Sequence, residues 1–220
     1  MIVLLESLAR KSSLNIVFED EFCLVVNKPA GLLSVPGRGV DKADCLITRV
    51  QTHAPTALIV HRLDRDTSGL LIIAKDKTIH RDLSLAFMNR AVDKSYVALV
   101  DGHMQAEAGI VDLPLDVDWP NRPLHHVNYE TGKPAQTEWQ QISYDAERDC
   151  TRVSLKPITG RTHQLRIHMQ SLGHSILGDT LYASAAAQAK SSRLCLHAEL
   201  LSLAHPVTKE RMQFECAAEF

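Results

Sequence analysis

The sequence predicts an α+β fold in which a mixed, largely antiparallel sheet is flanked by helices and loops. Many short segments have strand character, and several alternate apolar with polar residues, as in CTRVSLK (150–156). Fewer segments show helical periodicity, and these do not alternate regularly with the strands as they would in a parallel α/β sheet. The expected strands are 23–27, 57–60, 69–74, 95–100, 109–113, 136–143, 151–157, 194–203 and 211–216.

The expected helices are 44–53, 78–90, 161–172 and 184–190. In 78–90, Ile79 and Leu83 lie on one face, and either Asp76 or Thr78 can cap the first turn. Two long segments, 28–39 and 116–136, lack periodicity and are rich in Pro and Gly. We expect both to be loops, and long loops in a compact domain are usually functional.

At 220 residues the chain has the length of one domain, so we expect a single domain over 1–220 with 1–20 as an N-terminal extension. No apolar run approaches the roughly 20 residues needed to cross a membrane. Glu6 interrupts the apolar N-terminus, which argues against a signal peptide. The five cysteines are widely spaced without a C-x-x-C pair, so we expect reduced thiols in a cytoplasmic protein.

The net charge of −2 argues against a protein that coats nucleic acid nonspecifically, because such proteins are basic. The charge is nevertheless patterned along the chain. Segment 156–168 contains Lys156, Arg161 and Arg166 and no acid, whereas 101–118 is acidic without Lys or Arg. A local basic site is therefore compatible with the composition.

The motifs of the common metal and nucleotide sites are missing from the sequence. His163 and His168 are about 140° apart around a helix, too far to share an ion. No H-E-x-x-H, G-x-G-x-x-G, G-x-x-x-x-G-K-[ST] or G-x-S-x-G pattern occurs. We therefore expect no metal and no cofactor, which leaves cofactor-free chemistry or binding alone.

The segment HRLDRDTSG (61–69) lies between two apolar runs and concentrates charge at the edge of the core. Taken alone, it is most simply a charged turn, since Asp, Thr, Ser and Gly favour turns. Two other segments carry isolated functional side chains: KSYVAL (94–99) with Tyr96, and KPITGRTHQLRIHM (156–169) with Arg166. Considered alone, the position of Tyr96 predicts a half-buried aromatic side chain on a strand, and the position of Arg166 predicts a solvent-exposed arginine on a helix.

Together these segments closely resemble the RluA family of pseudouridine synthases. The resemblance runs from VVNKPAGLLSVPGR (25–38) through HRLDRDTSG, KSYVALVDGH, DLPLDVDWPNRP, YETGKPAQTEW, KPITGRTHQLRIHM and GHSILGDTLYA to LCLHAELLSL, nearly the whole chain. It implies the pseudouridine synthase catalytic fold, a monomer and no cofactor. Because few residues precede the first expected strand, the S4-like RNA-binding domain of larger relatives is expected to be absent.

The resemblance also implies roles for particular residues. It makes Asp64 the catalytic aspartate, Tyr96 the ring that packs on the target uracil and assists the later deprotonation, and Arg166 the partner of Asp64. Arg62 matches the position that enters the RNA stack when the target nucleotide flips out. The further residues expected to contact RNA are His61, Arg65, Arg38, Arg161, Trp119 and Arg122. The apolar residues expected to keep water from the pocket are Leu63, Leu70 and Leu196.

The implied reaction explains why one carboxylate among arginines would be useful. Isomerisation detaches uracil, turns it and reattaches it, so no atoms enter or leave, and the paired carboxylates of a glycosidase are not needed. Asp64 must be ionised in a partly dry pocket, and Arg166 would supply the countercharge. Attack at C1′, attack at C6 and proton abstraction at C2′ all remain open.

The segment 116–136 is most similar to that of the dual-specificity members of the family. It implies stem-loops of tRNA and 23S rRNA as RNA partners, with uridine 32 and uridine 746 as the targets. Three alternatives remain: a noncatalytic RNA-binding module, a uridine C5 methyltransferase, and a nucleoside hydrolase or ribosyl transferase. Analysis of the nucleosides formed from RNA by the protein alone separates these alternatives.

Overall fold

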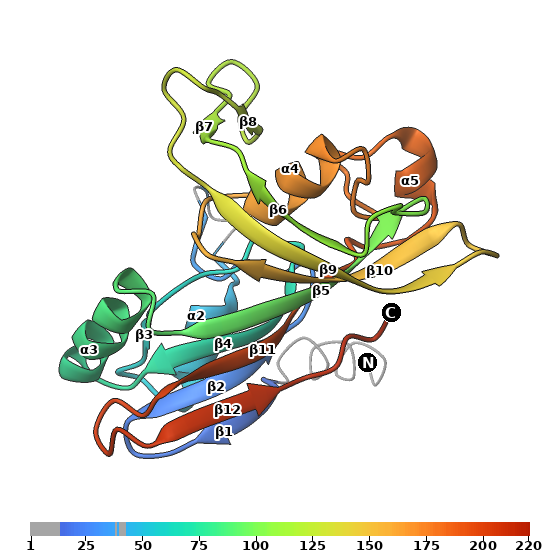
Figure 1. Cartoon of the computed structure of the whole chain (residues 1–220). Helices are drawn as coiled ribbons and strands as arrows, with labels where there is room; N and C mark the ends of the chain where they lie inside the picture. Colours follow the sequence, from blue (N-terminus) through green and yellow to red (C-terminus); the bar gives the residue numbers. More distant parts are fainter. Residues whose placement is uncertain (1–13, 38, 40–42) are drawn as a thin grey trace, which may run out of the picture. The chain divides into compact units, whose positions relative to one another are not determined.

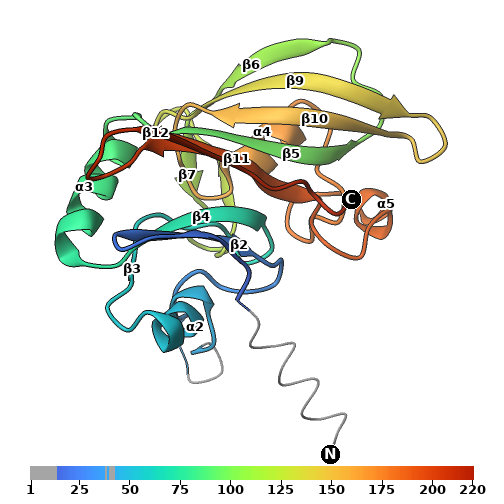
Figure 2. The same ribbon diagram turned by 90° about the horizontal axis from the view of Figure 1, so that it is seen from below.

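The structure, a computed structural model, describes residues 14–37, 39 and 43–220. The chain expected as one domain contains two compact units. Unit 1 comprises Met1–Val92 and Ser202–Cys216, and unit 2 comprises Asp93–Leu201 and Ala217–Phe220. Figures 1 and 2 colour the elements along the chain. Strand β11 (Leu196–Ala204) begins in unit 2 and ends in unit 1.

Unit 1 is built on antiparallel strands in the order β1-β2-β4, with β3 also paired to β4. The two central strands, β2 and β4, are almost entirely buried, which explains their continuous apolar sequences. The strands of this unit, besides the end of β11, are β1 (Ile16–Glu19), β2 (Cys23–Lys28), β3 (Leu58–Ile59), β4 (Ser68–Ala74) and β12 (Arg211–Glu215). Within 1–20, the range expected as an N-terminal extension, β1 pairs with β2 and is part of the sheet.

Within the described part of unit 1, the helices are α2 (Leu46–His53) and α3 (Lys77–Met88). Asp76 caps α3, because its carboxylate accepts the backbone N–H groups of Thr78 and Ile79 at 2.7 and 2.9 Å. Ile79 and Leu83 are the buried residues of this helix, as its periodicity predicts. Figure 2 shows α2 against one face of β2 and β4.

Unit 2 is built on four antiparallel strands in the order β5-β10-β9-β6. Leu99, Val153 and Leu155 of this sheet form a core with Leu165 and Met169 of the following helix. The strands are β5 (Asp93–Asp101), β10 (Cys150–Pro157), β9 (Gln136–Asp145) and β6 (Ala108–Asp112), and the helices are α4 (Gln164–Ser171) and α5 (Ala185–Ala189). Both helices lie on the same side of the sheet (Figure 1). The predicted α+β class with a largely antiparallel sheet is confirmed.

The segment 116–136, expected as a long loop, contains a small hairpin, so that expectation was wrong. Strands β7 (Leu115–Val117) and β8 (His125–Val127) pair antiparallel. Strands of three residues carry almost no periodic signal. Contacts with distant residues hold the hairpin, since the N–H of His125 donates to Tyr182 Oη at 2.9 Å.

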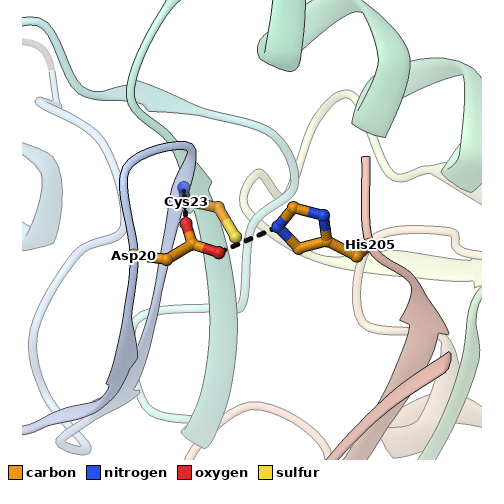
Figure 3. Close-up of side chains that lie close together, drawn as sticks. All are labelled: Asp20, Cys23 and His205. Atoms are coloured by element: carbon orange, nitrogen blue, oxygen red, sulfur yellow. Dashed lines mark hydrogen bonds and ion pairs between the residues drawn. The ribbon is translucent and has the colours of Figure 1, made fainter. Parts of the chain in front are cut away.

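Asp20, Cys23 and His205 of unit 1 lie together between two hairpins (Figure 3). Their donor atoms lie within 4.8 Å of one another and are of the types that zinc prefers. However, His205 Nδ1 accepts the N–H groups of Val207 and Thr208, so the ring proton is on Nε2, the atom that faces the cluster. This atom donates to Asp20 Oδ2 at 2.8 Å.

The thiol of Cys23 is also held in its protonated form. Burial, followed by the nearby charge of Asp20, raises the pKa of Cys23 to about 12. The second oxygen of Asp20 accepts the N–H groups of Phe22 and Cys23 at 2.7 and 2.8 Å. The cluster is thus a hydrogen-bonded clamp between the β1–β2 and β11–β12 turns.

His168 of α4 is completely buried in unit 2. Its Nδ1 lies 2.8 Å from Thr137 Oγ1, and its Nε2 lies 3.4 Å from the carbonyl oxygen of Leu113. Burial lowers the pKa of His168 from its ordinary value of 6.5, so the folded state holds the neutral ring. The stability that the neutral ring contributes is complete above pH 6.5 and is lost as the pH falls through the lowered pKa.

We therefore expect His168→Gln to flatten the pH dependence of unfolding. The free energy of unfolding of the wild type, measured with urea, should fall more steeply than that of the variant between about pH 7.5 and pH 5. His126→Gln, at an exposed position, is the matched control and should follow the wild type. Parallel curves for the wild type and His168→Gln would contradict the prediction.

Candidate active site

Asp64 lies in the segment that joins β3 to β4, and both sides of this segment are anchored in unit 1. On one side, Ser34 Oγ donates to the carbonyl of Leu63 at 2.7 Å and accepts the N–H of Leu63 at 3.1 Å. On the other side, Lys28 Nζ donates to the carbonyl of Arg65 at 2.9 Å. The residues before and after Asp64 are therefore fixed by two buried side chains.

Lys28 is the anchor that the sequence does not reveal. Its side chain is fully buried, and Nζ also donates to the carbonyls of Pro29 and Leu32, at 2.9 and 2.8 Å. A buried ammonium is costly unless its protons are bonded, and here three carbonyls bond it. The same cation thus connects the 29–32 turn with the segment that carries Asp64.

Three further residues of HRLDRDTSG differ in their surroundings: His61 packs within the protein, and Arg62 and Arg65 are exposed. His61 stacks on Phe87, with ring centroids 4.3 Å apart, and its Nε2 accepts the N–H of Ile72 at 3.2 Å. The side chains of Arg62 and Arg65 are exposed. Arg65 pairs with Asp66 at 2.9 Å. The reading of His61 as an RNA contact therefore competes with a packing role, whereas both arginines are accessible to a phosphate.

Two of the three predicted pocket leucines, Leu63 and Leu70, are buried in unit 1. Leu70 lies on β4 opposite Asn27 of β2. Gly69, immediately before it, has φ of 117°, a backbone conformation that favours glycine. Leu196, the third, is buried at the start of β11 in unit 2. The Gly of the motif is thus the second residue of β4, paired with Lys28 of β2, and the leucines are apolar core positions.

The second motif, KPITGRTHQLRIHM, forms the end of β10, a turn and α4 in unit 2. Gln164 holds this turn, because its Oε1 accepts from Thr159 Oγ1 and the N–H of Arg161 at 2.8 and 3.0 Å. Its Nε2 donates to the carbonyl of Gln136 and to Thr137 Oγ1. His163, the N-cap of α4, has φ of 56°, and its Nδ1 lies 2.6 Å from Tyr182 Oη. Side chains from β9 and from the 178–182 turn thus fix the start of the helix.

Arg166 is buried, so the reading of it as a solvated helix arginine is wrong. Its Nε donates to Asp179 Oδ2 at 2.7 Å, and its Nη2 donates to Asp179 Oδ1 at 2.6 Å. The guanidinium carbon lies 5.0 Å from the ring centroid of Tyr182. Sequence reasoning expected Asp64 as the partner of Arg166 and did not identify Asp179. The only sequence signal was its position in GHSILGDTLYA, directly after a glycine.

Tyr96 and the remaining RNA-binding candidates of unit 2 lie on several elements. Tyr96 is half-buried on β5, opposite Leu155 of β10, and packs against the core of the unit. Trp119 is 63% exposed, and the guanidinium carbon of Arg122 lies 4.2 Å from its ring centroid. Arg161 is exposed, with Nε bonded to the carbonyl of Pro134 at 3.1 Å. Arg38 lies outside the described residues.

Comparison with known proteins identifies the class. Residues 22–171 match the family model described as RNA pseudouridylate synthase. The solved structure of human RNA pseudouridylate synthase domain containing 1 has a TM-score of 0.80 and 28% identity, over 96% of this chain and 85% of that chain. Human RNA pseudouridylate synthase domain containing 4 has a TM-score of 0.74 and 26% identity, over 98% and 91% of the respective chains. The chain belongs to the RNA pseudouridylate synthase family, and it is an RNA pseudouridine synthase, an isomerase.

Among individual proteins, the chain is similar to those named dual-specificity RNA pseudouridine synthase RluA. That of Yersinia pestis is 52% identical over 93% of this chain and 99% of its own length. That of Escherichia coli K12 is 52% identical over 93% of both chains, and that of Vibrio parahaemolyticus is 50% identical over 87% of this chain and 78% of its own.

The helices of the described residues are all too short or too polar to cross a membrane.

The anchoring of Leu63 gives a testable expectation for the candidate site. Ser34→Ala leaves a buried N–H and a buried carbonyl of Leu63 without their partner, which costs about 1–3 kcal/mol of unfolding free energy. We expect pseudouridine formation to slow by about tenfold as well, because the backbone next to Asp64 is loosened. Urea unfolding and nucleoside analysis measure the two effects.

Ser84→Ala, at a half-buried position of α3, removes a hydroxyl from the same unit outside this segment and should change neither quantity. A Ser34→Ala variant that is destabilised but reacts as fast as the wild type would show that this anchor serves stability alone.

Proposed function

We propose that this synthase converts uridine 32 of tRNAs and uridine 746 of 23S rRNA into pseudouridine, with Asp64 as the residue that starts the reaction. The proposal is supported by the 52% identity, over 93% of this chain, to relatives named as dual-specificity enzymes. The single structural observation that carries it is the double anchoring of the Asp64 segment by Ser34 and Lys28. Catalysis requires a reacting group held in a narrow range of positions, and a charged surface turn needs no such buried support.

The proposed reaction needs no external reactant. The bond between N1 and C1′ breaks, uracil turns, C5 bonds to C1′, and the proton from C5 ends on N1. Asp64 attacks C1′ or C6, or removes the C2′ proton, and each of these routes requires an ionised carboxylate. Tyr96 packs on the uracil ring, and its hydroxyl takes part in the proton transfer from C5. Arg166 supplies a positive charge to Asp64.

RNA binding is assigned to exposed cations and one exposed aromatic platform. Arg62 fills the space left when the target nucleotide leaves its stack, a step that costs a few kcal/mol. Stacking of a base on an aromatic ring returns about 1–3 kcal/mol. Trp119, with the Arg122 guanidinium on its ring, offers such a platform on the β7–β8 hairpin. Uridines in loops are the cheapest to flip because they are not fully paired, which favours stem-loop substrates.

The catalytic assignment predicts the behaviour of Asp64→Asn. This change removes the charge and keeps the shape, so we expect pseudouridine formation to stop while RNA affinity stays within about tenfold of the wild type. The measurement is nucleoside analysis of a tRNA stem-loop after incubation with protein alone. Asp82→Asn, an exposed position on α3, is the matched control.

Turnover by Asp64→Asn above a few per cent of the wild-type rate would remove Asp64 from the chemistry. Release of free uracil by the wild type, in place of pseudouridine, would favour the hydrolase alternative.

The substrate assignment predicts two sites in cellular RNA. Deletion of the gene should abolish the pseudouridine signal at position 32 of several tRNAs and at position 746 of 23S rRNA, as mapped by carbodiimide-blocked reverse transcription. Complementation with the wild type should restore both signals, and complementation with Asp64→Asn should restore neither. Loss of only one signal would contradict dual specificity, and loss of neither would overturn the substrate assignment.

A further inference from the structure

We propose that Tyr129 is a substrate-recognition residue of this synthase, which stacks on an unpaired base of the RNA stem-loop at a second position besides Trp119. The inference deepens the proposed function and rests on it, because it takes a stem-loop to be the RNA that is bound. It concerns the β7–β8 hairpin of unit 2 and the turn that follows it. Figure 1 shows this hairpin at one end of the unit.

The hairpin and its following turn carry two exposed aromatic rings. Tyr129 is 78% exposed, more than any other large hydrophobic side chain of the described residues, and Trp119 is 63% exposed. In the described part of the chain, no hydrogen bond or ring contact holds the Tyr129 side chain. A single exposed ring needs no explanation. Two rings on neighbouring turns form a surface that suits planar, partly apolar groups such as unpaired bases.

The turn that carries Tyr129 is held rigidly. Asn128 Oδ1 accepts the N–H of Thr131 at 3.1 Å, and Thr131 Oγ1 donates to Asp116 Oδ2 of β7 at 2.6 Å. A Cβ at Gly132 would lie 2.1 Å from the carbonyl oxygen of Asn128, so this tight turn requires glycine there. The backbone of Tyr129 is therefore fixed before RNA binds, which lowers the entropy cost of stacking a base on its ring.

Tyr129 and Trp119 lie at opposite ends of the hairpin. Trp119 comes two residues after Val117, the last residue of β7. Tyr129 comes two residues after Val127, which pairs with Leu115 at the other end of β7. The strand between these ends is about 7 Å long, which is about twice the 3.4 Å rise between stacked nucleotides. The two rings are therefore assigned to two different bases of the RNA loop.

The charges around Tyr129 favour an uncharged planar ligand. Glu130 and Lys133 are both exposed on its turn, and their charges offset each other. Both oxygens of Asp116, on the adjacent strand, accept hydrogen bonds within the hairpin and its turn. The turn thus offers mainly a ring, and every RNA base has a π-face that stacks on such a ring. This surface suits an unpaired base better than an acidic or basic protein segment.

The first experiment measures the dissociation constant of a tRNA stem-loop for the wild type, Tyr129→Ala and Tyr129→Phe. We expect Tyr129→Ala to weaken binding by about tenfold, whereas Tyr129→Phe keeps the ring and stays within about twofold. The single-turnover rate at saturating RNA should be unchanged, because Tyr129 takes no part in the chemistry. Tyr144→Ala, at the end of β9 away from the hairpin, is the matched loss of a tyrosine and should bind normally.

Two results of this experiment would overturn the proposal. One is a Tyr129→Ala protein that binds as tightly as the wild type. The other is an equal loss of affinity in Tyr129→Ala and Tyr129→Phe, because the hydroxyl would then be the contact and not the ring. Since the side chain is exposed, its removal should also leave the urea unfolding curve unchanged.

The salt dependence of binding distinguishes stacking from contact with phosphates. Each phosphate contact steepens the fall of log K with log salt, whereas stacking does not. We expect Tyr129→Ala to bind more weakly at every salt concentration with the slope of the wild type. A smaller slope would show that this turn contacts phosphates and would overturn the stacking role.

Stem-loops that lack one loop base at a time identify the partner of each ring. At the position whose base stacks on Tyr129, we expect Tyr129→Ala to change affinity by less than about twofold, because the contact is already missing from the RNA. Trp119→Ala should lose its effect at a different position. A Tyr129→Ala effect that persists with every abasic RNA, or loss of both effects at one position, would overturn the assignment.

The wild type and Asp64→Asn are assayed in parallel with the same stem-loop. A wild type that neither binds nor modifies the stem-loop would reject the proposed function. A wild type that binds and modifies it, together with a Tyr129→Ala protein of equal affinity, would reject this inference alone.

Discussion

A buried cation must have bonded partners, and this requirement constrains two parts of the synthase. Lys28 and Arg166 are the two buried cations among the described residues, and each fixes the segments that supply its partners. Lys28 in unit 1 is surrounded by carbonyl oxygens, and Arg166 in unit 2 is bonded to a carboxylate. Removing the partners of a buried charge is strongly destabilising, because the charge is then left without compensation. Loops that would otherwise be variable are therefore fixed where they meet these side chains.

The two cations differ in the kind of partner that bonds them. Three carbonyls accept bonds from the Lys28 ammonium, and one of them belongs to Arg65, directly after Asp64. Asp179 accepts two bonds from Arg166, so the plane of the Arg166 guanidinium is fixed as well as its position. Lys28 thus fixes the backbone next to the proposed reactive carboxylate, and Arg166 is itself held in one orientation. Such fixed placement of charged and donor groups is what electrostatic catalysis requires.

Three histidines of this chain pack or bond within the protein, although histidine is a residue type often found in active sites. His168 is neutral and buried, His205 clamps two turns through Asp20, and His61 packs against Phe87. In each case at least one ring nitrogen is bonded to the protein itself. The cluster of Asp20, Cys23 and His205 is accordingly a hydrogen-bonded clamp, in which His205 Nε2 donates to Asp20 and Nδ1 accepts two backbone N–H groups.

The sequence by itself determined the fold class, most helices and strands, and the motifs that carry Asp64, Tyr96 and Arg166. These depend on periodicity and turn chemistry over short stretches, which local sequence encodes directly. Only the tertiary structure decided the partners. Lys28 and Arg65 are 37 residues apart, and Arg166 and Asp179 are 13 apart, with no periodic relation to reveal either contact. The short β7–β8 hairpin was missed for the same reason, since a bond from His125 to Tyr182, 57 residues away, helps to hold it. Side chains that meet across the fold are selected by burial and by the need to satisfy polar groups, and neither is visible until the chain has folded.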